Sequence, residues 1–252
     1  MPFTVSHIAA ILPYKAPGIP PLPFAALAVG SMAPDLVFYI PPLMQLGVHT
    51  HFMPFMFTFN VVLALLVWAA WRVIAPGVYE VSPQIVRKKW LPDSWGTHAW
   101  WTVPFAICAG IATHIILDNF THSWGWGPAH LASLRAEIST PFGPMFGYEL
   151  AQWIFGFIGL GLLLAVALWL PRQPSAASRT PVLQALAPFL VGAAILTGGF
   201  ARVMIAGGLV LRFESQMFYL LTGGMIAGAV TAAALSLVAL VAVRLRRVPA
   251  AA

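Results

Sequence analysis

The sequence predicts an all-α integral membrane protein with about five full transmembrane helices and an N-terminal re-entrant or broken helical hairpin. Of its 252 residues, 60% are hydrophobic and only 8% are charged. The mean hydropathy of +0.86 lies outside the range of soluble domains. Several apolar runs are long enough to cross a hydrocarbon layer of about 30 Å. These runs are 54–72, 101–120, 149–171, 183–205 and 217–243.

The first 40 residues are also apolar, but prolines break them into short pieces. Thr4 or Ser6 can cap a helix that ends near Tyr14, because their hydroxyl oxygens accept hydrogen bonds from free first-turn amides. The prolines of APGIPPLP, 16–23, then exclude a helix. A helix of about eleven residues rises only ~16 Å. We therefore expect this segment to enter the membrane and return with the run 20–40, or to lie on the membrane surface.

Basic residues mark the ends of the apolar runs. The net charge is +6, but the basic residues form no patch interleaved with aromatics, so we expect the lipid bilayer and no nucleic acid as a partner. They fall in three segments that alternate with loops poorer in Lys and Arg, and the positive-inside rule places these segments in the cytoplasm. The loops 41–53, 121–148 and 206–216 then face outward. The cytoplasmic set is Arg87, Lys88, Lys89, Arg172, Arg179, Arg244, Arg246 and Arg247.

This orientation gives a first testable prediction. Cysteines introduced at positions 88 and 250, in a background without Cys108, should not react with an impermeant thiol reagent added to whole cells. Both positions should react once the cells are permeabilised, because both lie on the cytoplasmic side. Labelling of both without permeabilisation would reverse the topology.

The chain shows no internal repeat and no soluble domain. Cys108 is the only cysteine, which excludes an intrachain disulfide and a cysteine-based metal site. We divide the chain into 1–165, a membrane-embedded core with the candidate metal site, and 166–252, two further transmembrane helices and a basic cytoplasmic tail. The last two apolar runs are rich in Ala and Gly, which permit close helix approach.

The segment THIILDNFTH, 113–122, contains two histidines and an acid within an apolar run. Helical positions four apart share a face, so His114 and Asp118 can converge on one ion. His122 lies ~12 Å along the axis from His114. Either two ions therefore lie side by side, or one end residue supports the ligands instead of binding metal. Imidazole and carboxylate together suit zinc, and also manganese or iron.

Other ionisable side chains lie in or beside the first apolar runs. Such groups are costly in a membrane and usually face a protein interior or an aqueous cavity. The predicted topology places several of them at the outward ends of their segments, and His7 joins them only if the N-terminal hairpin forms. His98 and His130 look solvated or interfacial, and we leave them out. The outward set is Asp35, His49, His51, Asp118 and His122.

Five motifs carry a resemblance to a known family: MPFTVSH, VGSMAPDL, HTHFMPF, THIILDNFTH and YELAQWIFGFIGL. Over about residues 1–165 they resemble a family of bacterial multi-pass membrane proteins catalogued as a domain of unknown function. That family is distantly similar to membrane-bound metal-dependent hydrolases. The resemblance favours His51 over His49, because Pro54 follows His51 by three. The metal ligands it implies are His7, Asp35, His51, His114, Asp118 and His122.

The first hypothesis is a metal-dependent hydrolase of the bacterial inner membrane with an outward-opening site. A metal-bound water would attack a lipid or another membrane-associated ester or phosphoester, and Asp118 or Asp35 would serve as the base. A second hypothesis is a transporter or proton relay, in which the same groups exchange protons or bind a passing ion. A third is a non-catalytic membrane scaffold with a structural metal.

Overall fold

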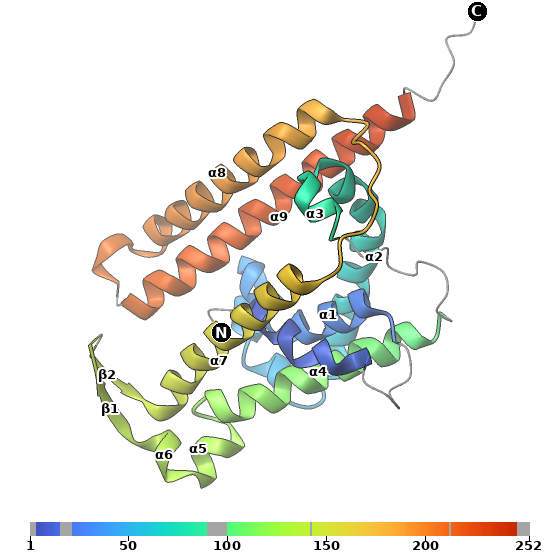
Figure 1. Cartoon of the computed structure of the whole chain (residues 1–252). Coiled ribbons are helices and arrows are strands. Elements are labelled where there is room, and N and C mark those ends of the chain that lie inside the picture. Colours follow the sequence, from blue (N-terminus) through green and yellow to red (C-terminus); the bar gives the residue numbers. More distant parts are fainter. Residues whose placement is uncertain (1–3, 16–21, 90–99, 142, 212, 246–252) are drawn as a thin grey trace, which may run out of the picture. The chain divides into compact units, whose positions relative to one another are not determined.

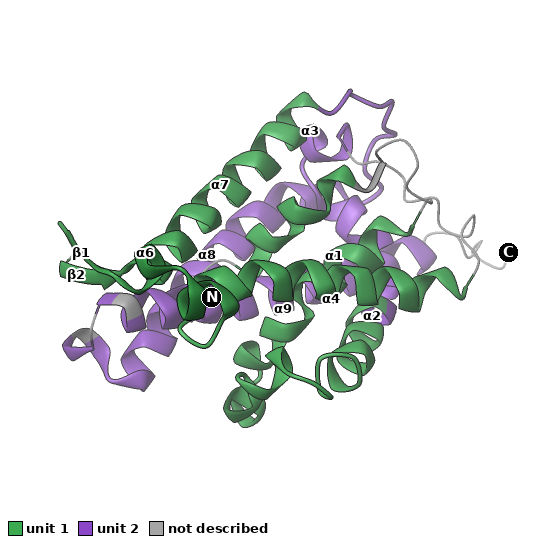
Figure 2. Ribbon diagram, turned by 90° about the horizontal axis from the view of Figure 1, so that it is seen from below, with its two compact units in different colours: residues 1–68, 93–169 green, residues 69–92, 170–252 purple. Residues whose placement is uncertain are grey.

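The computed structural model describes residues 4–15, 22–89, 100–141, 143–211 and 213–245 (Figure 1). The chain falls into two compact units (Figure 2). Unit 1 comprises 1–68 and 93–169, and unit 2 comprises 69–92 and 170–252.

Five helices in the described part of the chain are long and apolar enough to cross a membrane. The predicted fold class is therefore confirmed. Which ends of these helices face the cytoplasm stays a prediction from the charge pattern. The long helices are α2 (Phe59–Val81), α4 (Thr102–Thr121), α7 (Gly147–Trp169), α8 (Pro181–Ala206) and α9 (Phe213–Leu245).

The first long helix is displaced from its predicted position. We expected it over 54–72, but the residues around Pro54 form turns, and α2 runs on past Pro76 to Val81. A proline costs a helix one backbone hydrogen bond. Helix packing favours the extension, because the backbone at Gly77 approaches that at Ser236 on α9 so closely that a Cβ there would lie 2.3 Å from the Ser236 carbonyl oxygen. A four-residue helix, α3 (Gln84–Arg87), follows.

The N-terminal region is broken into short helical pieces, as the prolines predict. Its first piece is a 3₁₀ helix instead of the α-helix we expected, and its twelve residues rise about 24 Å, still less than the hydrocarbon thickness. Thr4 does not cap it through a side-chain acceptor; its hydroxyl donates to Asp35 instead. The pieces are η1 (Thr4–Lys15), α1 (Phe24–Met32), η2 (Ala33–Tyr39), η3 (Pro41–Leu46) and η4 (His49–His51).

Helices α1 and α4 cross in direct backbone contact within unit 1. A Cβ at Gly30 would lie 2.3 Å from the Ile107 carbonyl oxygen, and one at Gly110 would lie 2.3 Å from the Leu27 carbonyl oxygen. Only glycine permits so close an approach. The crossing buries Leu27, Ile107 and other apolar side chains in one core. It also fixes the end of α1 beside the next turns of α4.

The 3₁₀ helix η1 packs against α7, α1 and α4. At its contact with α7, a Cβ on Gly159 would lie 2.8 Å from the Ser6 side chain. This contact fixes the depth of η1 in unit 1, and so the position of His7, which follows Ser6.

The predicted outward loop 121–148 holds more structure than we expected. It contains two short helices and an antiparallel pair of strands in which Glu137 pairs with Phe146. Neither feature is predicted from the sequence. The elements are α5 (Trp126–His130), α6 (Ala132–Arg135), β1 (Glu137–Thr140) and β2 (Gly143–Phe146).

Unit 2 is built on α8 and α9, which pack along their lengths (Figure 1). The contact uses glycines, as expected from the composition: a Cβ at Gly223 would lie 2.6 Å from the Gly198 carbonyl oxygen. Glu80, near the end of α2, forms an ion pair with Arg179 in the segment before α8, with 2.7 Å between Oε1 and Nη2.

Candidate metal centre

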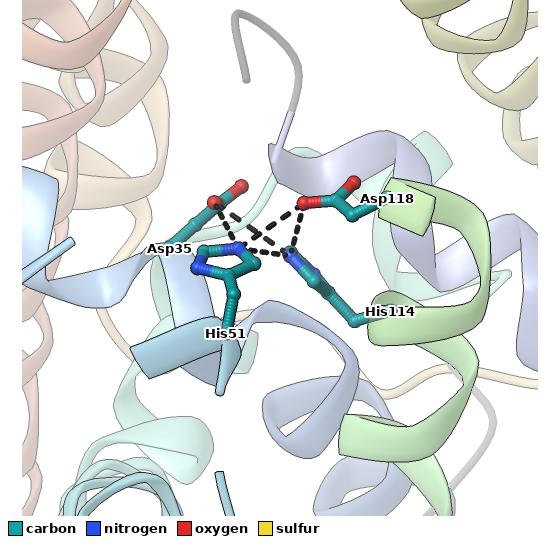
Figure 3. Close-up of side chains that lie close together, drawn as sticks. All are labelled: Asp35, His51, His114 and Asp118. Atoms are coloured by element: carbon teal, nitrogen blue, oxygen red, sulfur yellow. Dashed lines mark hydrogen bonds and ion pairs between the residues drawn. The ribbon is translucent and has the colours of Figure 1, made fainter. Parts of the chain in front are cut away.

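Four side chains from three segments converge inside unit 1 (Figure 3). Asp35 comes from η2, directly after α1, and His51 comes from η4. His114 and Asp118 come from successive turns of α4. All four are buried: His114 and Asp118 are 0% exposed, Asp35 is 1% exposed and His51 is 6% exposed.

The four ligand atoms lie within 4.8 Å of one another. Asp118 Oδ2 is 3.1 Å from Nε2 of both His51 and His114. Asp35 Oδ1 is 3.7 Å from the same two nitrogens, which are 3.2 Å apart. Ligands about 2.0–2.1 Å from a tetrahedral ion lie about 3.3–3.4 Å from one another. The observed separations bracket that value.

Backbone contacts fix the tautomers of both histidines. His51 Nδ1 is 2.8 Å from the Gly47 carbonyl oxygen, and His114 Nδ1 is 2.8 Å from the Ser31 carbonyl oxygen. A carbonyl oxygen only accepts, so each Nδ1 carries a proton and donates it. In the neutral rings each Nε2 then presents a lone pair to the centre. This arrangement, in which a backbone carbonyl holds the second ring nitrogen, is typical of metal-bound histidine.

The centre therefore gathers two imidazole lone pairs and two carboxylate oxygens. Asp35 Oδ1 and both oxygens of Asp118 have no hydrogen-bond partner among the described residues. Buried acceptors without partners are expensive, and four that face one another also repel. A cation bound between them would remove both costs.

Neighbouring hydroxyl and amide groups hold these ligands in place. Thr4 donates to Asp35 Oδ2 over 2.8 Å, and Tyr39 donates to Thr4 over 2.8 Å. Thr50, between the two loop histidines, donates to the Pro34 carbonyl, and the Asn60 amide donates to the Thr50 carbonyl. The η2 and η4 backbones are thereby fastened to each other and to α2.

His7 lies beside the four-ligand group but not within it. Its ring stacks on that of His114, with centroids 3.8 Å apart and planes inclined by 20°. His7 Nε2 is 3.7 Å from Asp118 Oδ1.

His122 lies at the rim of the centre. The chain leaves the helical conformation there, at φ −132° and ψ 144°, and Nδ1 is 3.6 Å from Asp118 Oδ2. Its side chain is 22% exposed. His122 Nε2 is 3.4 Å from the Gln152 amide nitrogen, and its ring stacks on Trp124 with centroids 5.2 Å apart. Of the six predicted ligands, His122 is the one with direct access to the surroundings.

The other histidines lie away from the centre or outside the described residues. His49 is exposed, with its ring 6.0 Å from that of Phe55. The structure therefore places His51, and not His49, among the ligand atoms. His130 is also exposed and stacks on Trp126. His98 lies outside the described residues.

Sequence reasoning missed the residues that support the ligands. The sequence predicts a helix cap at Thr4 and gives no role to Asn60, Tyr39 or Thr50. One signal was available: Asn60 is a polar residue near the start of an apolar span, and such residues usually face a partner inside the protein. Thr4 could not be found in this way, because its partner Asp35 is remote in sequence.

In the comparison with known proteins, the chain matched the profile of one family. A family profile described as a domain of unknown function, DUF4184, matches residues 1–243. The match extends beyond the 1–165 inferred from the motifs and includes the last two spans. No curated protein and no solved structure matched, so no comparison supports similarity to metal-dependent hydrolases. The length of the profile match shows that the chain belongs to the DUF4184 family.

Proposed function

We propose that this protein is a membrane-bound, metal-dependent hydrolase that acts on a lipid or another membrane-associated ester or phosphoester. One observation carries the proposal. Four buried acceptor atoms, from Asp35, His51, His114 and Asp118, surround one point at separations that suit a shared ion. Nδ1 of each histidine contacts a backbone carbonyl, so the neutral form of each ring presents the Nε2 lone pair to this point.

The donor set favours zinc. Zinc, which is intermediate between hard and soft ions, commonly binds imidazole nitrogens and carboxylate oxygens. The distances between the four ligand atoms also fit tetrahedral geometry. Manganese and iron accept the same ligands with larger coordination numbers. A bound ion of this kind would lower the pKa of its water to about 7 and would polarise an ester or phosphoryl oxygen.

The chain's own residues would supply orientation and proton transfer. His51 and His114 are locked by their backbone carbonyl partners, so their lone pairs stay directed to the centre. The oxygens nearest Nε2 of His51 and His114 are Asp118 Oδ2 and Asp35 Oδ1, which leaves Asp118 Oδ1 and Asp35 Oδ2 as the second oxygens of the two carboxylates. We assign the role of proton acceptor for an attacking water to one of these two second oxygens. Asp35 Oδ2 is already held by Thr4.

The rim of the centre suits an apolar substrate. Trp124 lies over His51 and His122, with centroids 5.5 and 5.2 Å away, and Phe52 lies 5.0 Å from Trp124. Phe52 is 43% exposed and Met53 is 67% exposed. Exposed apolar side chains beside a polar centre favour a molecule with an apolar body and an ester or phosphoester group.

Hydrolysis can be tested on the purified protein. Fluorogenic phospholipid and carboxylic-ester analogues in mixed micelles should be cleaved by the metal-loaded protein. Cleavage should stop after chelation and return when Zn²⁺ or Mn²⁺ is added. His51→Ala should be inactive, whereas His49→Ala, on the same loop but outside the centre, should match the wild type.

Two other experimental results would each indicate a different function for the protein. Proton or ion flux into liposomes that is pH-dependent, needs no metal and is lost in Asp118→Asn, without ester cleavage, would identify a transporter or proton relay. Loss of the folded state on chelation, without any turnover of the metal-loaded protein, would identify a structural metal in a scaffold.

A further inference from the structure

His7 is a buried side chain that the four-ligand centre leaves unused. It is 1% exposed, and neither of its ring nitrogens has a hydrogen-bond partner among the described residues. Its ring is held by stacking on His114 and by the packing of η1 against α7. Burying an imidazole without polar partners costs free energy. A cation bound to a ring nitrogen of His7 would offset that cost.

The two oxygens of Asp118 face different neighbours. Oδ2 lies 3.1 Å from the Nε2 atoms of His51 and His114. Oδ1 lies 3.7 Å from His7 Nε2 and has no hydrogen-bond partner among the described residues. A separation of 3.7 Å is too long for a hydrogen bond. It is close to the spacing of about 3.3–3.4 Å between two ligands of one tetrahedral ion, and wider coordination angles lengthen that spacing.

His7 does not belong to the first group of ligands. That group comprises ligand atoms that all lie within 4.8 Å of one another, and His7 falls outside it. His7 Nε2 nevertheless approaches the Asp118 carboxylate at Oδ1, whereas His114 Nε2 approaches the same carboxylate at Oδ2. The rings of His7 and His114 are stacked. Their Nε2 atoms therefore lie side by side, each facing a different oxygen of Asp118.

We propose that the site holds two divalent cations, with the second bound by His7 Nε2 and Asp118 Oδ1. This inference rests on the proposed metal centre, which supplies the first cation. Asp118 bridges the pair through its two oxygens, as carboxylates do in sites whose ions lie about 3.5–4 Å apart. Water or a substrate oxygen fills the remaining positions of the second ion.

The two proposed cations favour one class of substrate and one proton acceptor. Two adjacent cations can stabilise both the attacking and the leaving oxygen of a phosphoryl group, so the site suits a phosphoester more than a carboxylic ester. With both oxygens of Asp118 bound to metal, the proton acceptor becomes Asp35 Oδ2, which accepts a hydrogen bond from Thr4.

Metal stoichiometry tests this inference. The wild-type protein, loaded with Zn²⁺ and passed through a desalting column, should contain two ions per chain by elemental analysis. His7→Ala should contain one, and His49→Ala should contain two. One ion in both the wild type and His7→Ala would overturn the pair but keep the proposed centre. Two ions in His7→Ala would also overturn it, and none in the wild type would refute the centre itself.

A spectroscopic measurement covers the case in which His7→Ala fails to fold. Two Mn²⁺ ions bridged by one carboxylate are exchange-coupled, and their electron paramagnetic resonance spectrum differs from that of isolated Mn²⁺. The Mn²⁺-loaded wild type should show the coupled spectrum, and His7→Gln should show a single uncoupled ion. An uncoupled spectrum from the wild type at saturating Mn²⁺ would contradict the assignment.

Discussion

Replacing either His114 or Asp118 with alanine is expected to weaken divalent-metal binding by at least about 100-fold. Loss of a supporting residue alone typically costs 10–100-fold in affinity, and these two side chains supply ligand atoms themselves. Both are completely buried, and Asp118 Oδ2 is within 3.1 Å of both histidine nitrogens of the centre. Elemental analysis after extensive dialysis measures the effect as metal retained per chain.

His130→Ala is the matched control, because His130 lies at the end of α5 and stacks on Trp126 away from the ligand group. It should keep the wild-type metal content. His114→Gln and Asp118→Asn preserve side-chain size, and size-exclusion chromatography shows whether each variant folds. If folded His114→Ala and Asp118→Ala both retain the full metal content, the centre is wrongly assigned.

Gly110→Val is expected to disrupt unit 1. A Cβ at this position would lie 2.3 Å from the Leu27 carbonyl oxygen and 2.6 Å from the Ser31 amide nitrogen. Backbone atoms cannot turn aside as a flexible side chain can, so α1 and α4 must separate. Overpacking lowers the free energy of unfolding by about 1–3 kcal/mol in a well-packed core. Separating two helices should lower it by at least as much. The variant should unfold at a lower temperature and lose metal, because Asp35 follows α1 and His114 follows Gly110 by one turn.

Gly161→Val provides the matched comparison. Gly161 also lies within an apolar helix, α7, and, apart from its own stretch of helix, no atom of the described residues lies within 4 Å of a Cβ placed there. Valine should therefore be tolerated, with an unfolding temperature and a metal content close to the wild type in a thermal shift assay and elemental analysis. Equal stability of the two variants would show that α1 and α4 do not cross at Gly110.

Helical periodicity made part of the centre predictable from sequence. The spacing of His114 and Asp118 depends only on local geometry, and the structure places both side chains in one ligand group. The apolar runs similarly predicted the long helices, since length and hydropathy alone decide whether a segment can span a membrane. Asp35 was identifiable because an acid between apolar runs is costly without a partner.

Features that depend on contacts between remote segments could not be predicted in this way. Whether η1 forms an α-helix or a 3₁₀ helix depends on its packing against α1, α4 and α7. The role of Thr4 follows from its contact with Asp35, which lies across the break in the hairpin. Only the family resemblance distinguishes His51 from His49, because two residues that alternate in a loop carry no helical periodicity.

The four ligands come from separate pieces of the chain, and this has a consequence for biogenesis. Asp35 and His51 enter the membrane with the N-terminal pieces, well before α4 brings His114 and Asp118. A nascent chain that lacks α4 holds only two of these four residues. If the centre binds an ion as proposed, the ion completes its ligand set only after α4 has been made, and binding then joins the N-terminal pieces to α4.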